Sequence, residues 1–152
     1  MVALNKYAVC FDVDNTISDT RHRAHYVENK VPKLRQWVEF FDAMGGDTVI
    51  QPTVDMLKRY YAQGLTVILI TGRPETHRLL TTTWLLDNNI PYHQLIMKNK
   101  HDVRMQAALW KAKMMGQLQD EGYVIKLAVD DEPSVREMYT AIGVMNIEPV
   151  LT

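Results

Sequence analysis

The sequence predicts an α/β fold in which helices cover both faces of a parallel β-sheet. Short apolar runs rich in β-branched residues alternate with stretches of helical periodicity. Helix-breaking residues mark the borders between them, with prolines where helices should begin and glycines where they should end. Strands that alternate with helices pair in parallel through right-handed crossovers, so a Rossmann-like three-layer α/β/α fold is expected. The residues at these borders are Pro52, Pro74, Pro133, Gly64 and Gly143.

Five segments predict the strands of this sheet. Each is apolar over consecutive residues instead of alternating with polar ones, which is typical of strands that are buried on both faces. The last segment carries the weakest pattern. The segments are residues 7–13, 65–70, 95–97, 124–129 and 144–150.

Helical stripes fill the intervals between these strands, with apolar residues recurring every three or four positions. One further helix is expected between Arg73 and Lys98. Trp37, Trp84 and Trp110 lie on apolar helical faces, which predicts that they belong to the core. The three stripes are Val54, Leu57 and Tyr61; Val103, Ala107, Trp110 and Met114; and Val135, Met138, Tyr139 and Ile142.

An insertion interrupts the alternation at about residues 17–50. Its only clear pattern is the stripe Leu34, Trp37, Val38 and Phe41, which predicts one short amphipathic helix. This helix either lies over the functional site as a minimal cap or simply covers the sheet edge. With no linker or repeat in the sequence, residues 1–152 are treated as one domain.

Composition narrows the classes of protein that fit. A chain of 152 residues is long enough to bury a core without disulfides, and Cys10 has no partner for one. With 17 basic and 18 acidic residues, the net charge of -1 argues against nucleic-acid binding over the whole surface. The N-terminal residues show no signal-peptide pattern and no apolar run is long enough for a membrane span, so a cytoplasmic protein is expected.

Polar side chains cluster where three predicted strands end. Asp12 and Asp14 close the first strand, residues 71–73 (Thr-Gly-Arg) close the second, and Asp130 and Asp131 close the fourth. Open α/β sheets bind ligands at the carboxyl ends of their strands, so these side chains should meet there. Four carboxylates repel one another unless a cation lies among them. Hard oxygen ligands without a histidine or cysteine pattern favour Mg²⁺.

These clusters carry a family resemblance. DVDNT resembles the DxDxT motif of the haloacid dehalogenase (HAD) superfamily of phosphatases, LITGR resembles its second motif, and AVDDEPS its acidic fourth motif. The three motifs occur in the family's order and cover most of the chain. The stretches HRAHYV, PYHQLIMK and KLAVDDEPSVREMYTAIGV further resemble the 3′-phosphatase domains of the bacteriophage polynucleotide kinase-phosphatase type, which implies a role in nucleic-acid repair. No GxxxxGK[ST] motif is present, so the resemblance is to the phosphatase half alone.

The resemblance implies roles for the clustered residues. Asp12 would be the nucleophile that forms an aspartyl-phosphate, and Asp14 the acid and base. The Mg²⁺ ligands would be Asp12, the backbone carbonyl of Asp14, and Asp130 or Asp131. The remaining contacts to the phosphorylated substrate would come from Thr71, Gly72 and Arg73, and from a flap that holds Arg21 and Arg23.

The sequence departs from the family pattern at two positions. Asn15 replaces the familiar glycine after the second aspartate, and asparagine tolerates a left-handed backbone. The third-motif lysine has no clear counterpart: aligned on Leu109 and Trp110, it falls on Met105. Its cation is expected to come from Lys98, Lys100 or Arg104.

Three functions remain open from the sequence. The first is a Mg²⁺-dependent phosphomonoesterase that removes 3′-phosphates from polynucleotide ends, favoured because the short insertion leaves the site open to a strand end. The second is a nucleotidase or small-metabolite phosphatase of the same superfamily. The third is a non-enzymatic phosphoacceptor receiver module, which the DxD on a single strand disfavours. The sequence sets no oligomeric state.

Overall fold

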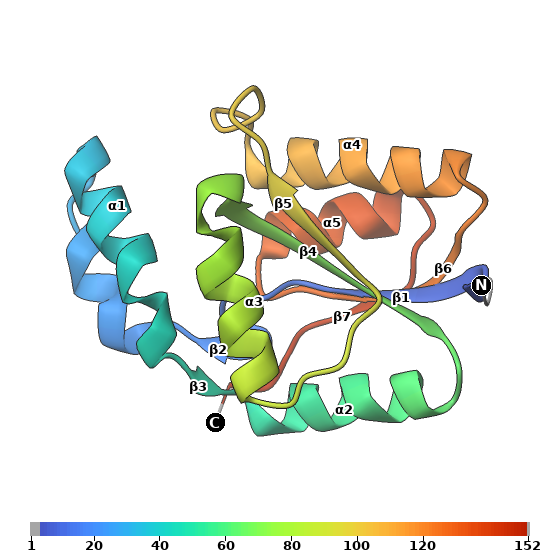
Figure 1. The fold of residues 1–152 in the computed structure, drawn as a ribbon. Coiled ribbons are helices and arrows are strands. Elements are labelled where there is room, and N and C mark those ends of the chain that lie inside the picture. The colour runs from blue at the N-terminus through green and yellow to red at the C-terminus, as the bar shows by residue number, and fades with distance from the viewer. Residues whose placement is uncertain (1–3, 152) are drawn as a thin grey trace.

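A five-stranded parallel sheet forms the centre of the protein (Figure 1), as the sequence predicts. The structure is a computed structural model and describes residues 4–151. The strand order is β5-β4-β1-β6-β7, and every neighbouring pair is parallel. The strands are β1 (Tyr7–Phe11), β4 (Thr66–Pro74), β5 (Gln94–Lys98), β6 (Val124–Val129) and β7 (Asn146–Ile147).

Helices cover both faces of this sheet and bury two apolar layers. On one face, Val9 and Phe11 of β1 pack with side chains of α2 and α3. On the other, Ala8 and Cys10 pack with α4 and α5. Alternate residues of β1 therefore point into opposite layers, which explains its unbroken apolar run. The helices are α2 (Gln51–Ala62), α3 (Arg78–Asp87, preceded by the short η3, Glu75–His77), α4 (Ala107–Asp120) and α5 (Pro133–Ala141).

The chain changes direction across the sheet at β1. From β1 it proceeds through β4 to β5, and then returns to the other side of β1 as β6 and β7. Open α/β sheets bind ligands at this switch, beyond the carboxyl ends of the strands. Asp12 lies there and remains tied to the sheet, since its amide donates to the carbonyl of Val129 at 2.9 Å.

The insertion forms a small cap beside the carboxyl ends of the strands (Figure 1). A two-stranded antiparallel ribbon closes its base, with Ser18 paired to Val49 and Asp19 to Thr48. Between the two strands lie one α-helix and two short 3₁₀ segments. The elements are β2 (Ser18–Asp19), η1 (Arg21–Val27), α1 (Leu34–Asp42), η2 (Ala43–Gly46) and β3 (Thr48–Val49).

The structure differs from the predicted elements in detail. Pro74 ends β4 instead of beginning a helix, and Val103 lies in an exposed turn before α4. Trp84 and Trp110 are buried as predicted, but the prediction for Trp37 was wrong because its side chain is partly exposed. The weak last strand shrinks to two residues. No helix within residues 4–151 has the length and apolar character that a transmembrane span requires.

Candidate active site

A buried lysine joins two of the strand-end aspartates. Lys111, on α4, lies 3.0 Å from Asp12 Oδ1 and 2.5 Å from Asp130 Oδ2 through its Nζ. All three side chains are nearly inaccessible. Burial alone would lower the pKa of Lys111, but the carboxylates of Asp12 and Asp130 outweigh it and raise that pKa. Lys111 is therefore a permanent cation between two carboxylates.

Asp131 completes a cluster of oxygen ligands with these two aspartates. Carboxylate oxygens of Asp12, Asp130 and Asp131 lie within 4.8 Å of one another. Burial raises the pKa of Asp12 well above its usual range, against the opposing effect of Lys111, and burial also raises the pKa of Asp131. A cation among these groups would favour their charged forms. The all-oxygen donor set fits Mg²⁺, which HAD phosphatases generally use.

Asp14 points into a different environment from Asp12. Its Oδ1 accepts hydrogen bonds from Arg73 at 2.7 and 3.0 Å and from Arg23 at 2.9 Å. Burial would raise the pKa of Asp14, but the two guanidinium groups outweigh it and hold that pKa below its usual value. The side chain of Asp14 thus belongs to an arginine cluster, whereas Asp12, Asp130 and Asp131 form the acidic cluster that could hold a metal ion.

Asp47, which the sequence analysis did not single out, holds both arginines in place. Its carboxylate accepts from Arg23 at 2.8 and 2.9 Å and from Arg73 at 3.2 Å. It also accepts from the hydroxyl of Ser18 and pairs with His22 Nε2 at 2.6 Å. The Arg23 and Arg73 side chains are fully buried, so two carboxylates compensate two guanidinium groups within the protein.

The second motif lies at an irregularity of β4. The register between β4 and β5 shifts between Thr71 and Pro74. This irregularity releases Gly72 to the surface while Thr71 and Arg73 remain buried. The amide of Arg73 donates to Thr71 Oγ1 at 3.2 Å, which fixes the threonine hydroxyl beside the arginine cluster.

The structure gives the following positions for the cations that were predicted for the flap and for the third motif. Arg23 was expected on a substrate-contacting flap, but it is buried and bound to Asp14 and Asp47. Arg21 is exposed and pairs with Asp19. Lys98 donates to the carbonyl of Met105 at 2.5 Å, and burial lowers its pKa. Lys100 and Arg104 are exposed.

Sequence reasoning missed Lys111 although its helix carries a signal. Lys111 follows Ala107 by four residues and precedes Met115 by four, so it lies on the apolar side of α4. A lysine on the buried side of a helix is expensive unless a carboxylate compensates it. Alignment on Leu109 and Trp110 instead predicted the third-motif cation upstream of α4, at the end of β5 or in the loop that follows it.

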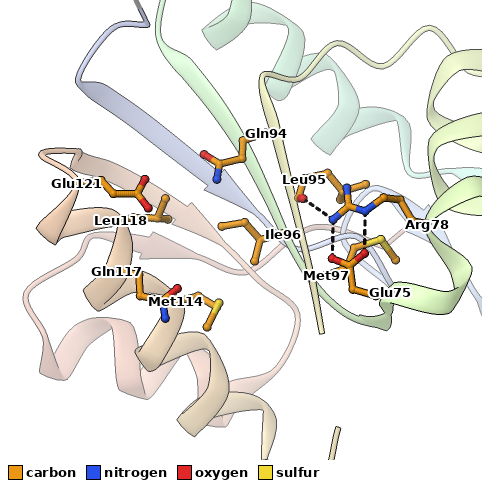
Figure 2. Close-up of a pocket in the computed structure, with 10 residues that line it drawn as sticks. All are labelled: Glu75, Arg78, Gln94, Leu95, Ile96, Met97, Met114, Gln117, Leu118 and Glu121. Carbon is orange, nitrogen blue, oxygen red and sulfur yellow. Dashed lines mark hydrogen bonds and ion pairs between the residues drawn. The ribbon is translucent and has the colours of Figure 1, made fainter. Parts of the chain in front are cut away.

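Two of the cavities in the described part of the chain lie next to the carboxyl-terminal half of β4 or to β5. The larger, about 750 Å³, lies between α1 and the segments that follow β4 and β5, and Gly72 lines it. The smaller, about 260 Å³, opens at the β5 edge of the sheet (Figure 2). In the smaller cavity Arg78 pairs with Glu75 at 2.7 Å and donates to the carbonyl of Leu95 at 3.1 Å. Arg78 and Glu75 thus compensate each other in the smaller cavity, whereas the larger cavity adjoins the second motif.

Comparison with known families gives the site its context. The model of the HAD superfamily, subfamily IIIB (acid phosphatase), matches residues 2–134. The chain belongs to this family. The match spans every strand-end cluster described above, so the carboxyl ends of the strands are the candidate active site of this HAD-family chain.

Solved structures share the fold. A chain of the Pnkp1/Rnl/Hen1 complex has a TM-score of 0.78 at 22% identity and is matched over 97% of the present chain and 47% of its own. The class C acid phosphatase from Bacillus anthracis has a TM-score of 0.69 at 16% identity, over 95% and 66%. A putative beta-phosphoglucomutase from Thermotoga maritima has a TM-score of 0.58 at 14% identity, over 91% and 82%. The present chain spans about half the length of the Pnkp1-complex chain that it matches.

Replacement of Lys111 should destabilise the protein strongly. Lys111→Met leaves Asp12 and Asp130 buried without their shared cation, which should lower the free energy of unfolding by about 3 kcal/mol at neutral pH in metal-free buffer. The control is Lys58→Met on α2, which replaces an exposed lysine and should cost less than about 1 kcal/mol. Urea denaturation measures both. Equal losses for the two variants would contradict the assigned charge balance.

Proposed function

We propose that this HAD phosphatase is a Mg²⁺-dependent phosphomonoesterase that works through an aspartyl-phosphate on Asp12 and removes 3′-phosphates from polynucleotide ends. The cluster of Asp12, Asp130, Asp131 and Lys111 is the observation that carries the catalytic part of this proposal. It supplies a carboxylate nucleophile, ligands for a divalent cation and a fixed positive charge at one point of the sheet.

In the first step, an oxygen of Asp12 attacks phosphorus and the bond from phosphorus to the leaving oxygen breaks. The leaving oxygen receives a proton from Asp14. In the second step, water attacks the aspartyl-phosphate, gives a proton to Asp14 and releases inorganic phosphate as the bond to Asp12 breaks. When bound by Asp12, Asp130 and Asp131, Mg²⁺ would neutralise carboxylate and phosphoryl charge.

The remaining residues hold these groups in position. Lys111 orients Asp12 through its 3.0 Å contact, and the hydroxyl of Thr71, which accepts from the Arg73 amide, would donate its own proton to a phosphoryl oxygen. Arg23 and Arg73 stabilise Asp14 as a carboxylate, the form that accepts a proton from water. Asp14 can protonate the leaving oxygen only when it carries a proton itself. The deprotonated form that the two arginines favour is therefore the form that acts in the second step.

The small cap supports a substrate larger than a metabolite. The cap consists of α1 and short flanking segments, and the groove beside it remains open at the surface. Lys98 and Lys100 line that groove, and the exposed Lys100 would contact backbone phosphates of a nucleic-acid strand. The resemblance to 3′-phosphatase domains, and the fold shared with a chain of the Pnkp1/Rnl/Hen1 RNA repair complex, support this substrate class. The alternative is a nucleotidase, for which the same groove would hold a single nucleotide.

Activity should depend on a divalent cation bound by the acidic cluster. Chelation should abolish turnover and Mg²⁺ should restore it. Asp131→Asn should raise the Mg²⁺ concentration for half-maximal rate by at least about tenfold, because one ligand loses its charge. Asp120→Asn, an exposed change at the end of α4, is the matched control. Full activity after exhaustive chelation would exclude the proposed metal dependence.

Substrate length should decide between the two phosphatase alternatives. For a 3′-phosphorylated oligonucleotide, kcat/KM should exceed that for a 3′-mononucleotide by at least about tenfold at low salt, and the difference should shrink as salt rises. A 5′-phosphorylated oligonucleotide should be a poor substrate. Lys100→Gln should weaken the length preference, whereas Lys58→Gln on α2 should preserve it. Equal efficiencies for both lengths at every salt concentration would favour the nucleotidase.

A further inference from the structure

The apolar side of α1 does not enter the protein core. No residue of this helix is buried, and Leu34 and Trp37 are 80% and 40% exposed. Amphipathic helices ordinarily pack their apolar side against the domain. Here the side formed by Leu34, Trp37, Val38 and Phe41 instead lines the cavity of about 750 Å³. We call this cavity, together with the α1 side chains that line it, the α1 groove.

The α1 groove adjoins the candidate active site at the second motif. Gly72 lines it and lies between Thr71 and Arg73, whose guanidinium group contacts Asp14. Lys98, at the end of β5, lines the same groove. A phosphoester whose phosphorus lies at Asp12 would therefore extend its organic part toward α1. Because the groove adjoins the second motif, the organic part of the substrate is its natural occupant.

The chemistry of the groove matches a planar aromatic group. The rings of Trp37 and Phe41 have centroids 6.0 Å apart and lie within 26° of parallel, and the ring of His77 lies 5.6 Å from that of Phe41. Polar groups of Thr76 and Asn99 and the charges of Lys98 and Lys100 complete the lining. Aromatic faces beside cations are typical of surfaces that bind single-stranded nucleic acid. The cavity volume also falls within the range of small-molecule sites.

Arg23 ties α1 to the catalytic residues. Its guanidinium group lies 4.2 Å from the centroid of the Phe40 ring and donates to the Phe40 carbonyl at 3.2 Å. The same group donates to Asp14 at 2.9 Å. A second tie comes from His77, whose Nε2 lies 2.8 Å from Asp42 at the end of α1. Both ties fix the position of the helix relative to the site, so a group held on α1 is also placed relative to Asp12 and Asp14.

We infer that the α1 groove binds the nucleobase of the nucleotide that carries the scissile phosphate, by stacking it on Trp37. This inference rests on the proposed function and deepens it. The phosphate is then recognised at the strand ends and the base at the cap. Specificity for nucleic-acid ends arises from the distance between the two sites instead of from enclosure of the substrate.

Steady-state kinetics with Trp37→Ala test this inference. The loss of kcat/KM on a 3′-mononucleotide should exceed the loss on glycerol phosphate by about tenfold or more, mainly through KM, because only the nucleotide has a base to stack. Trp37→Phe should restore most of the difference. Arg35→Ala, an exposed change on the other side of α1, is the matched control. Equal losses on the two substrates would overturn the inference.

A titration without phosphate tests the groove independently of turnover. A nucleoside added to the Asp12→Asn protein should quench tryptophan fluorescence, since Trp37 is partly exposed while Trp84 and Trp110 are buried. The quenching should be absent in Trp37→Ala. Unchanged fluorescence at millimolar nucleoside would overturn the inference, as would self-association through this surface that the nucleoside does not affect. If the wild-type protein hydrolyses no phosphoester, the proposed function fails, while this titration still decides whether the groove binds a base.

Discussion

Compensation of buried negative charge at the carboxyl ends of the strands is the constraint on which the site depends. Asp12, Asp14, Asp47 and Asp130 gather there in largely water-excluded surroundings, and isolated carboxylates in such a place would take up protons or unfold the protein. Lys111 compensates Asp12 and Asp130, while Arg23 and Arg73 compensate Asp14 and Asp47. The cations come from α4, from the cap and from β4. The two clusters thus connect parts of the chain that are far apart in sequence.

The separation of these two clusters gives Asp12 and Asp14, the two candidate catalytic aspartates, different properties. Asp12 faces one lysine and two further carboxylates, and burial raises its pKa. Asp14, two residues later, faces two arginines that lower its pKa. Successive side chains of an extended segment diverge, but Asp12 and Asp14 are two residues apart and would share one side in a regular strand. β1 ends at Phe11, and Asn15 adopts a left-handed backbone with φ of 58°, so the chain turns and Asp14 reaches the arginines.

Much of this architecture follows from the sequence, because buried parallel strands and amphipathic helices leave strong periodic patterns. The five strands, the polar clusters at their ends and the helix in the insertion are predicted in this way. Lys111 and Asp47 escaped prediction because their importance lies in contacts across 99 and 24 positions of the chain, which no local pattern reports. Trp37 was misplaced for a related reason: periodicity shows that a helix has an apolar side, but it does not show whether that side faces the core or a groove.

The central claim is that Asp12 is the nucleophile of a phosphatase site built around this charge balance. The direct test is the turnover number of purified Asp12→Asn with a 3′-phosphorylated oligonucleotide and saturating Mg²⁺, alongside an unfolding curve. The amide oxygen can still accept from Lys111, so the fold should survive. We expect a loss on the order of 10⁴-fold or more, since an amide cannot form the aspartyl-phosphate. A folded variant that retains turnover within about tenfold of wild type would contradict the claim.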